Sequence, residues 1–342
     1  MNKLGLVFDN RYLYHTIPQA SPENPDRIRK LYIHLQQKLI NDCFIHIAPR
    51  EASDSEIHAV HSPFYMEQLR EHSVKSDPFS YDKDTYLMED TLPAARLAAG
   101  GCFSLVDQIM KGNIDYGFAL VRPPGHHATP GRGMGFCVFN NVALTAEYLR
   151  KTYGLQRILI LDFDVRHANG TQEIFYESNK TLLCSIHQKG LFPFSGEADE
   201  IGTGEGKGFT INLPVHPQFG DTEYTHLLGR TLQGLMEQYL PQFILVSAGY
   251  DAHKDDSISE TVLSSDWFAT ITHILRRHAA EICDNRLLFV LEGGYNPVSL
   301  EESIFATIDA LLQDNFVRPG ICPAPRAEKI LAGHPLHQYW TI

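Results

Sequence analysis

Two aspartates, Asp162 and Asp164, follow an apolar run of the sequence and stand two residues apart. The run from Arg157 to Ile160 predicts a buried strand, and residues two apart on a strand point to the same face. Two carboxylates on one face repel each other unless a cation lies between them. The pair therefore predicts a cation site at the end of a strand, and a solvated loop is the plainer alternative.

Three other apolar runs also end in side chains suited to metal-assisted hydrolysis. The histidine pair His126-His127 follows one run, Asp251 follows the second and Tyr295 follows the third. Taken one at a time, these residues have ordinary explanations as surface, turn-forming or packing side chains. The carboxyl ends of parallel strands lie at one edge of a sheet, so we expect all four strand ends to meet in one crevice.

Strands alternate with helices along the chain, which predicts an α/β fold with a mostly parallel sheet covered on both faces. No linker and no internal repeat is visible, so residues 1–342 are expected to form one domain. The predicted strands are Leu4–Phe8, Phe44–Ile47, Tyr116–Val121, Arg157–Ile160, Thr181–His187, Phe209–Leu213, Phe243–Ser247 and Leu287–Leu291. The main predicted helices are Asp26–Asn41, Ser53–Ala59, Pro63–Ser73, Ala94–Lys111, Asn140–Tyr153, Asp221–Tyr239, Asp266–Cys283 and Leu300–Leu312. The predicted irregular segments are Asp9–Asp26, Ser76–Leu92, Gln188–Lys207 and the tail from Asn315 to Ile342.

The composition disfavours several classes of protein. A formal net charge of −12 argues against direct binding of nucleic acid, whereas a basic peptide or a polycation stays open as a substrate. No run of about 18 apolar residues exists, so we expect no membrane span, and the first residues are too quickly acidic for a signal peptide. The six cysteines form no CxxC pair, which favours reduced thiols in a cytoplasmic protein.

Five segments of the chain resemble the motifs of a known family. They are Arg122–Ala128, Gly135–Ala143, Asp162–Gln172, Ser247–His253 and Glu292–Asn296. In this order they look like the zinc-dependent histone deacetylase and acetylpolyamine amidohydrolase superfamily, in particular its bacterial class II-like branch. The resemblance implies an arginase-like fold, a single three-layer α/β/α domain. It runs from about residue 9 to residue 312, and residues 313–342 are expected to be a C-terminal extension of the same domain.

The resemblance implies a catalytic role for each strand end. Asp164 and Asp251 match two of the family's three zinc ligands. His126 and His127 match the tandem histidines that handle the protons of the water and of the leaving amine, and Tyr295 matches the hydroxyl that polarises the substrate carbonyl. Catalytic zinc takes three protein ligands and lowers the pKa of its bound water to about 7, so such a set suits the hydrolysis of an acetylated amine.

The resemblance also implies supporting residues. Asp162 would orient His126, and Asn169 would pair with His127. A narrow apolar tunnel would admit the acyl chain, because acylation has removed the charge of the amine. The predicted tunnel residues are Gly135, Phe136, Phe192, Ile258 and Gly294. Structural sites for K⁺ or Na⁺ are predicted at Asp162, Asp164 and Ser185, and at Phe175, Ser178 and Thr181.

One position departs from the family pattern. The family's third zinc ligand is a histidine, and this chain has Arg166 there. Arginine stays protonated and offers no lone pair, so it cannot be a ligand. In one alternative its guanidinium reaches between Asp162, Asp164 and Asp251 and neutralises them, and in another it swings away from them. His167 is not expected to replace the missing ligand, because strand alternation points it to the opposite face.

Three hypotheses follow for the function. In the first, Arg166 swings away and zinc binds weakly through Asp164, Asp251 and waters or another donor, and deacetylation of acetyl-lysine or a related acetylated amine is impaired. In the second, the chain is a metal-free pseudoenzyme or a module that binds an acyl amine or a partner, with Arg166 in place of the zinc charge. In the third, Arg166 is a variant of an otherwise active enzyme. Ile258 lies near the position where polyamine-selective relatives carry an acidic residue, which favours acyl-lysine or another uncharged acyl amine.

Overall fold

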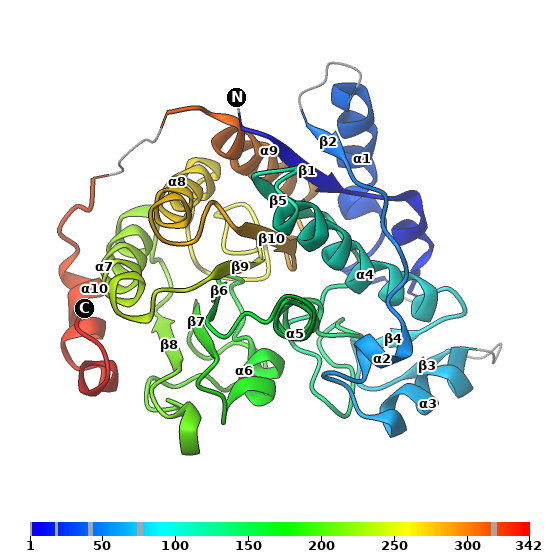
Figure 1. Ribbon diagram of the computed structural model, residues 1–342, viewed down its shortest axis with the longest axis horizontal. Helices are drawn as coiled ribbons and strands as arrows, with labels where there is room; N and C mark the ends of the chain where they lie inside the picture. The colour runs from blue at the N-terminus through cyan, green and yellow to red at the C-terminus, as the bar shows by residue number, and fades with distance from the viewer. Residues whose placement is uncertain (1, 18–19, 40–43, 74–77, 316–319) are drawn as a thin grey trace.

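An eight-stranded parallel sheet forms the centre of the fold (Figure 1). The computed structural model describes residues 2–17, 20–39, 44–73, 78–315 and 320–342. The strands lie in the order β2-β1-β5-β10-β9-β6-β7-β8, and each neighbouring pair is parallel. They are β1 (Leu4–Val7), β2 (Ile45–His46), β5 (Tyr116–Ala119), β6 (Ile158–Asp162), β7 (Thr181–Gln188), β8 (Thr210–Val215), β9 (Phe243–Ala248) and β10 (Leu287–Leu291). The predicted parallel sheet is confirmed.

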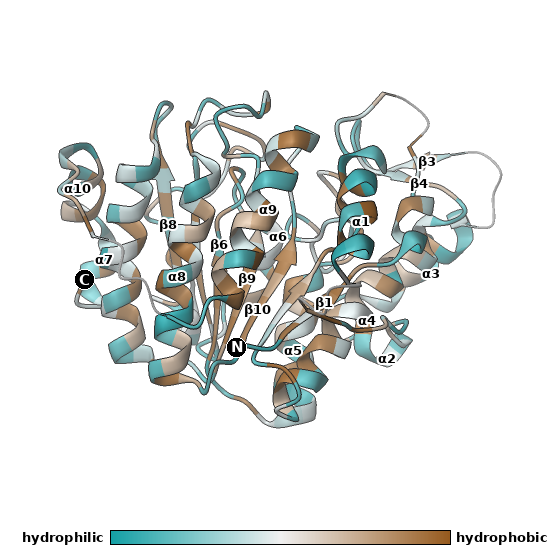
Figure 2. Ribbon diagram, turned by 90° about the horizontal axis from the view of Figure 1, so that it is seen from above, coloured by the Kyte–Doolittle hydropathy of each residue, from teal (hydrophilic) through white to brown (hydrophobic). Residues whose placement is uncertain are grey.

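Helices cover both faces of the sheet (Figures 1 and 2). Helices α4 and α5 pack together on one face, whereas α7, α8 and α9 pack on the other and α1 lies against α9. Every residue of β6, β9 and β10 is buried, as a parallel sheet with two covered faces requires. The helices are α1 (Asp26–Leu39), α2 (Asp54–Ile57), α3 (Pro63–Ser73), α4 (Thr91–Met110), α5 (Asn141–Tyr153), α6 (Asn169–Phe175), α7 (Asp221–Tyr239), α8 (Ser265–Ile282), α9 (Pro297–Leu312) and α10 (Pro325–Ala332). The expected end of the first helix at Asn41 lies outside the described residues.

Local sequence explains how the helices begin, end and pack. The Asn140 side chain accepts a hydrogen bond from the Ala143 N–H at the start of α5, and Gly154 ends that helix in a left-handed conformation. On α4, a Cβ atom at Gly100 would lie 1.9 Å from the carbonyl oxygen of Arg50. Only glycine permits this approach, so the segment that carries Arg50 packs directly on the helix backbone.

The segments predicted to be irregular contain short regular elements, among them a 3₁₀ turn, η2 (Gly204–Gly206). A hairpin, β3 (Phe79–Ser80) with β4 (Tyr86–Leu87), forms because the Asp82 side chain accepts hydrogen bonds from the Asp84 and Thr85 N–H groups and closes the turn. A 3₁₀ turn, η1 (Asn10–Tyr14), follows β1 because the Asp9 side chain caps it. Sequence periodicity is not informative for elements this short.

The C-terminal tail covers the edge of the sheet. Helix α10 packs against α7 and β8, and a 3₁₀ turn, η3 (Pro335–Gln338), follows it. His334 Nε2 lies 2.7 Å from the carbonyl oxygen of Asn212, and Trp340 Nε1 donates to the carbonyl oxygen of Gly208 at 2.6 Å. These contacts cover part of the edge strand β8, whose free backbone groups would otherwise be open to pairing with another chain.

Candidate active site

The four predicted strand ends meet at one edge of the sheet. Strands β5, β6, β9 and β10 are followed by His126-His127, Asp164, Asp251 and Tyr295. A Cβ atom placed on Gly293 would lie 2.3 Å from Asp251 Oδ2 and 2.6 Å from Asp164 Oδ2, so the two carboxylates converge on one point. His126 Nε2 lies 3.8 Å from Asp164 Oδ1 and joins the histidines to this group.

Each histidine of the pair has its own partner. His126 Nδ1 lies 3.1 Å from Asp162 Oδ2, and His127 Nδ1 lies 2.7 Å from Asn169 Oδ1. The structure therefore contains both orienting contacts that the sequence predicts. The partners differ in charge, because a carboxylate faces His126 and a neutral amide faces His127.

The unlike partners separate the pKa values of the two imidazoles. Burial alone would lower the pKa of His126, but the carboxylates of Asp162 and Asp164 outweigh burial and raise the pKa to about 10. Burial and the charge of His126 hold the pKa of His127 well below its ordinary value. At neutral pH His126 is therefore charged, whereas His127 is neutral and keeps one ring nitrogen as a proton acceptor.

Asp164 and Asp251 supply oxygen atoms that suit a cation, but they are only two ligands. Asp251 Oδ1 accepts a hydrogen bond from the Val165 N–H at 3.0 Å, and Asp251 Oδ2 is buried without a hydrogen-bond partner among the described residues. Burial and the neighbouring carboxylate of Asp164 raise the pKa of Asp251 well above its ordinary value. Catalytic zinc takes three protein ligands, and Arg166 has no lone pair. The residues of this chain therefore supply two of the three protein ligands that a catalytic zinc ion takes, and the set is incomplete.

Of the two alternatives for Arg166, the structure does not show the bridge to the carboxylates. In the described part of the chain its side chain forms no ion pair or hydrogen bond, and its Nε is buried without a partner. Strand β6 ends at Asp162, so the alternation that would aim Arg166 at the carboxylates no longer holds there. The backbone N–H of Arg166 donates to Asp164 Oδ1 at 3.0 Å instead. The guanidinium acts at longer range, where its charge opposes the rise in the pKa of Asp251 that burial and Asp164 cause.

His167 lies away from the carboxylates, as predicted. Its Nδ1 is 2.8 Å from Ser195 Oγ, and its Nε2 is 3.0 Å from Gln172 Oε1. Both ring nitrogens are thus engaged with neutral side chains. His167 does not supply the missing third ligand.

Aromatic side chains stand beside the catalytic residues. Phe192 makes an edge-to-face contact with His127 at 5.1 Å between ring centroids, and the ring of Phe136 lies 5.8 Å from that of Tyr295. A Cβ atom on Gly135 would lie 2.6 Å from His127 Cδ2 and 2.8 Å from Phe192 Cε1, so this position must be glycine. These three predicted tunnel residues therefore lie beside His127 or Tyr295.

The other two predicted tunnel residues, Ile258 and Gly294, have contacts of a different kind. Ile258 is partly buried against the core, and its N–H donates to Asp256. A Cβ atom on Gly294 would lie 2.7 Å from Leu300 Cδ1, which points into the protein. Gly294 therefore packs closely against Leu300, and its place in the tunnel wall stays a prediction.

Some of the residues predicted to bind monovalent cations contact one another. Asp162 and Ser185 pair across β6 and β7, and the Ser185 hydroxyl lies 2.9 Å from His187 Nδ1. In the second set, the Ser178 N–H donates to the Phe175 carbonyl oxygen at 2.9 Å. The buried hydroxyl of Thr181 has no hydrogen-bond partner in the described structure. K⁺ or Na⁺ binding at both places stays a prediction.

Glu292 is a buried carboxylate at the site to which the sequence pattern assigned no role. Its Oε2 accepts hydrogen bonds from the N–H groups of Gly125 at 2.6 Å and His126 at 3.2 Å, and its Oε1 accepts from the Ser247 hydroxyl. Burial raises its pKa to about 7. The residue holds the ends of β5, β9 and β10 together. Its partners are mostly backbone groups far away in the chain, which no local motif reveals.

A buried cluster of charged residues contacts Tyr295 and the loop that carries it. Glu23 pairs with Arg122 through two hydrogen bonds of 2.6 and 2.7 Å, and with Arg27 at 3.2 Å. Arg27 also donates to the carbonyl oxygens of Glu292 and Gly294, and its guanidinium carbon lies 4.9 Å from the centroid of the Tyr295 ring. The cluster ties the segment after η1 to the loop that carries the tyrosine.

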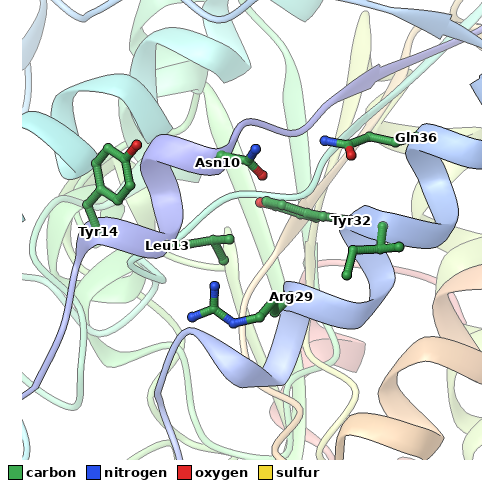
Figure 3. Close-up of a pocket in the computed structure, with 7 residues that line it drawn as sticks. Asn10, Leu13, Tyr14, Arg29, Tyr32 and Gln36 are labelled. Atoms are coloured by element: carbon green, nitrogen blue, oxygen red, sulfur yellow. The ribbon is translucent and has the colours of Figure 1, made fainter.

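A cavity of about 490 Å³ lies away from these residues, between η1 and α1 (Figure 3). It is lined by Asn10, Leu13, Tyr14, Arg29, Tyr32, Ile33 and Gln36. None of the predicted site residues lines it, so it plays no part in the candidate chemistry.

A parallel α/β domain that gathers tandem histidines, two aspartates and a tyrosine at one sheet edge has the organisation of a hydrolase. Residues 21–311 match the family model described as "Histone deacetylase domain". The chain belongs to the histone deacetylase family, and the family together with its deacetylase-named relatives identifies it as an amidohydrolase of deacetylase type.

Three relatives illustrate this membership. A "Probable deacetylase" of Archaeoglobus fulgidus is 36% identical over 85% of this chain and 81% of its own length. The "Polyamine deacetylase HDAC10" of Homo sapiens is 37% identical over 87% of this chain, which spans 45% of that longer protein. The crystal structure of the HDA15 HD domain superposes with a TM-score of 0.91 at 31% identity, covering 99% of this chain and 95% of that one. The three-layer deacetylase fold predicted from the sequence is thereby confirmed.

Proposed function

We propose that this chain has the site of a zinc-dependent deacetylase for an acetylated lysine or a small acetylated amine, and that Arg166 impairs it. One observation carries the proposal. The histidine pair with its partners, the two aspartates and the tyrosine are assembled, while the third ligand position has a side chain that cannot ligate. The native chain then holds zinc weakly and hydrolyses its substrate slowly.

The residues of the chain divide the proton chemistry between them in this proposal. Neutral His127, held by Asn169, is the group that accepts a proton and later gives it to the leaving amine. Charged His126, held by Asp162, stabilises negative charge that develops on the substrate. The Tyr295 hydroxyl donates to the substrate carbonyl oxygen, and burial, which raises the pKa of Tyr295 well above its ordinary value, keeps that proton in place.

Several features support an uncharged acyl amine as the substrate. Phe136 and Phe192 offer apolar surface beside the catalytic residues, and Ile258 lies on the loop that Asp256 joins to the backbone of Tyr295. Substrate proteins and polyamine-like molecules both stay open, because one relative is named a polyamine deacetylase and others are named histone deacetylases. None of the described helices is long and apolar enough to cross a membrane. We propose a cytoplasmic location, although two relatives are named as chloroplastic.

Zinc content tests the proposal directly. The native chain and Arg166→His are purified side by side without chelator, and zinc is measured by elemental analysis. We expect about one equivalent in Arg166→His, because imidazole completes the set of three ligands, and far less in the native chain. One equivalent in both proteins would show that Arg166 does not weaken zinc binding, and none in either would contradict the assignment of Asp164 and Asp251.

A metal-free binding module is the second candidate. It rests on two buried atoms without a hydrogen-bond partner in the described structure, Asp251 Oδ2 and Arg166 Nε. The N–H of a bound acyl amine would donate to Asp251 Oδ2, and its carbonyl oxygen would accept from Arg166 Nε. This candidate requires that the native chain binds an acetyl-lysine peptide in the presence of chelator. Titration calorimetry under that condition distinguishes it from the impaired enzyme.

Tyr295→Phe and His127→Ala are expected to abolish most of the deacetylase activity of the Arg166→His protein. Loss of one oxyanion donor costs on the order of 10²- to 10³-fold in kcat, and loss of the proton acceptor costs a similar factor. Zinc content should stay unchanged in both double variants, because neither residue is a ligand. Full activity in both would contradict the roles proposed for these residues.

A further inference from the structure

Asp256 is a buried acidic residue that accepts hydrogen bonds from two separate segments of the site. It is 4% exposed. Its Oδ2 accepts from the N–H groups of Tyr295 at 2.6 Å and Asn296 at 3.1 Å, and its Oδ1 accepts from the N–H of Ile258 at 3.2 Å. One carboxylate therefore joins the backbone of the tyrosine to the loop after β9.

A second contact joins the same two segments. The Asn296 side-chain amide donates to the carbonyl oxygen of Asp255 at 2.8 Å, and the same side chain caps α9 through the N–H groups of Val298 and Ser299. The backbone of Tyr295 is therefore held by the Asp256 carboxylate, and the next residue, Asn296, is held by the start of α9 and by Asp255.

We propose that Asp256 is a positioning residue that fixes the Tyr295 hydroxyl at the substrate carbonyl and holds Ile258 in register with it. The inference rests on the proposed deacetylase function and adds the residue that orients its oxyanion donor. Three N–H donors on one carboxylate make charge-assisted hydrogen bonds, which are stronger and shorter than neutral ones. Oxyanion stabilisation depends on donors that are already in place when the charge develops.

Asparagine is the informative replacement because it is nearly the same size and has only one acceptor oxygen. In Asp256→Asn the new NH₂ group must face either the Ile258 N–H or the N–H groups of Tyr295 and Asn296. One side of the contact is therefore lost in either orientation. Asp255→Asn is the matched control, because the Asp255 side chain is 60% exposed and its Oδ2 lies 3.7 Å from His253 Nδ1, beyond hydrogen-bond distance.

The first measurement needs no activity. Hydrogen exchange is followed by mass spectrometry on the otherwise native chain, in peptides that contain Tyr295 and Asn296. In Asp256→Asn we expect these amides to exchange roughly 10-fold faster, whereas the exchange rates of the amides in helices α4 and α5 stay unchanged. Asp255→Asn should leave them at the native rate. Unchanged exchange in Asp256→Asn, or faster exchange throughout the protein, would overturn the proposal.

The second measurement separates positioning from a merely structural role. In the Arg166→His background, Asp256→Asn is expected to lower kcat on the order of 10²-fold without changing KM, because the tyrosine is misplaced in the transition state. With Tyr295→Phe also present, the same change should cost nothing further. An equal loss in both backgrounds would show that Asp256 does not act through Tyr295. An inactive Arg166→His protein would contradict the deacetylase function, and the exchange experiment would still decide the role of Asp256.

Discussion

Arg166→His is expected to raise the hydrolysis of an acetylated lysine by more than about 100-fold. Loss of a residue that merely supports a metal ligand costs about 10- to 100-fold in affinity or activity, and loss of a ligand costs more. The rest of the site needs no rearrangement, since His126 and His127 already have their partners. Steady-state release of a fluorophore from an acetyl-lysine peptide, with and without added zinc, measures the gain.

Arg166→Ala is the control that separates a new ligand from a removed charge. Both variants delete the guanidinium, whose Nε is buried without a partner in the described structure, but only histidine adds a lone pair. We expect Arg166→Ala to remain near the native rate. An equal gain in the two variants would mean that the positive charge alone inhibits the site. No gain in Arg166→His, despite bound zinc, would place the defect elsewhere.

The sequence predicted the meeting of the strand ends because the argument needed only topology. In a parallel sheet the ends of β5, β6, β9 and β10 must lie at one edge, whatever the details of packing. The pairing of His126 with Asp162 and of His127 with Asn169 followed from long, ordered motifs that resemble the family. Residues that closely follow the strands, or that stand in these motifs, were therefore placed correctly.

The contact of Arg166 could not be predicted because it depends on where the strand stops. The alternation of side chains holds through Asp162, and the chain then bends, so that the backbone N–H of Arg166 takes an oxygen of Asp164. The roles of Glu292 and Asp256 were not predicted from the sequence for a related reason. Their partners are mainly backbone N–H groups of distant segments, and a backbone donor leaves no trace in the sequence.

Glu23→Gln is expected to destabilise the fold by about 3 to 5 kcal/mol, the cost of breaking a buried ion pair from one side. Glu23 and Arg122 are fully buried, and the change leaves the guanidinium groups of Arg122 and Arg27 without their anion. Urea unfolding at neutral pH measures the loss. Asp26→Asn is the matched control, since Asp26 is 79% exposed in its pair with Arg29 and such surface pairs contribute little.

The same variant should change how stability depends on pH. Burial alone would raise the pKa of Glu23, but the charges of Arg122 and Arg27 outweigh it and lower the pKa from 4.5 to about 2 in the folded protein. The stabilisation from this carboxylate is therefore complete above pH 4.5 and disappears as the pH falls from there towards 2. In Glu23→Gln the free energy of unfolding should depend less on pH between 4.5 and 2. Near neutral pH it should be lower than in the native chain and should not change with pH because of this residue. An unchanged acid slope would mean that other carboxylates, and not Glu23, account for the loss of stability in acid.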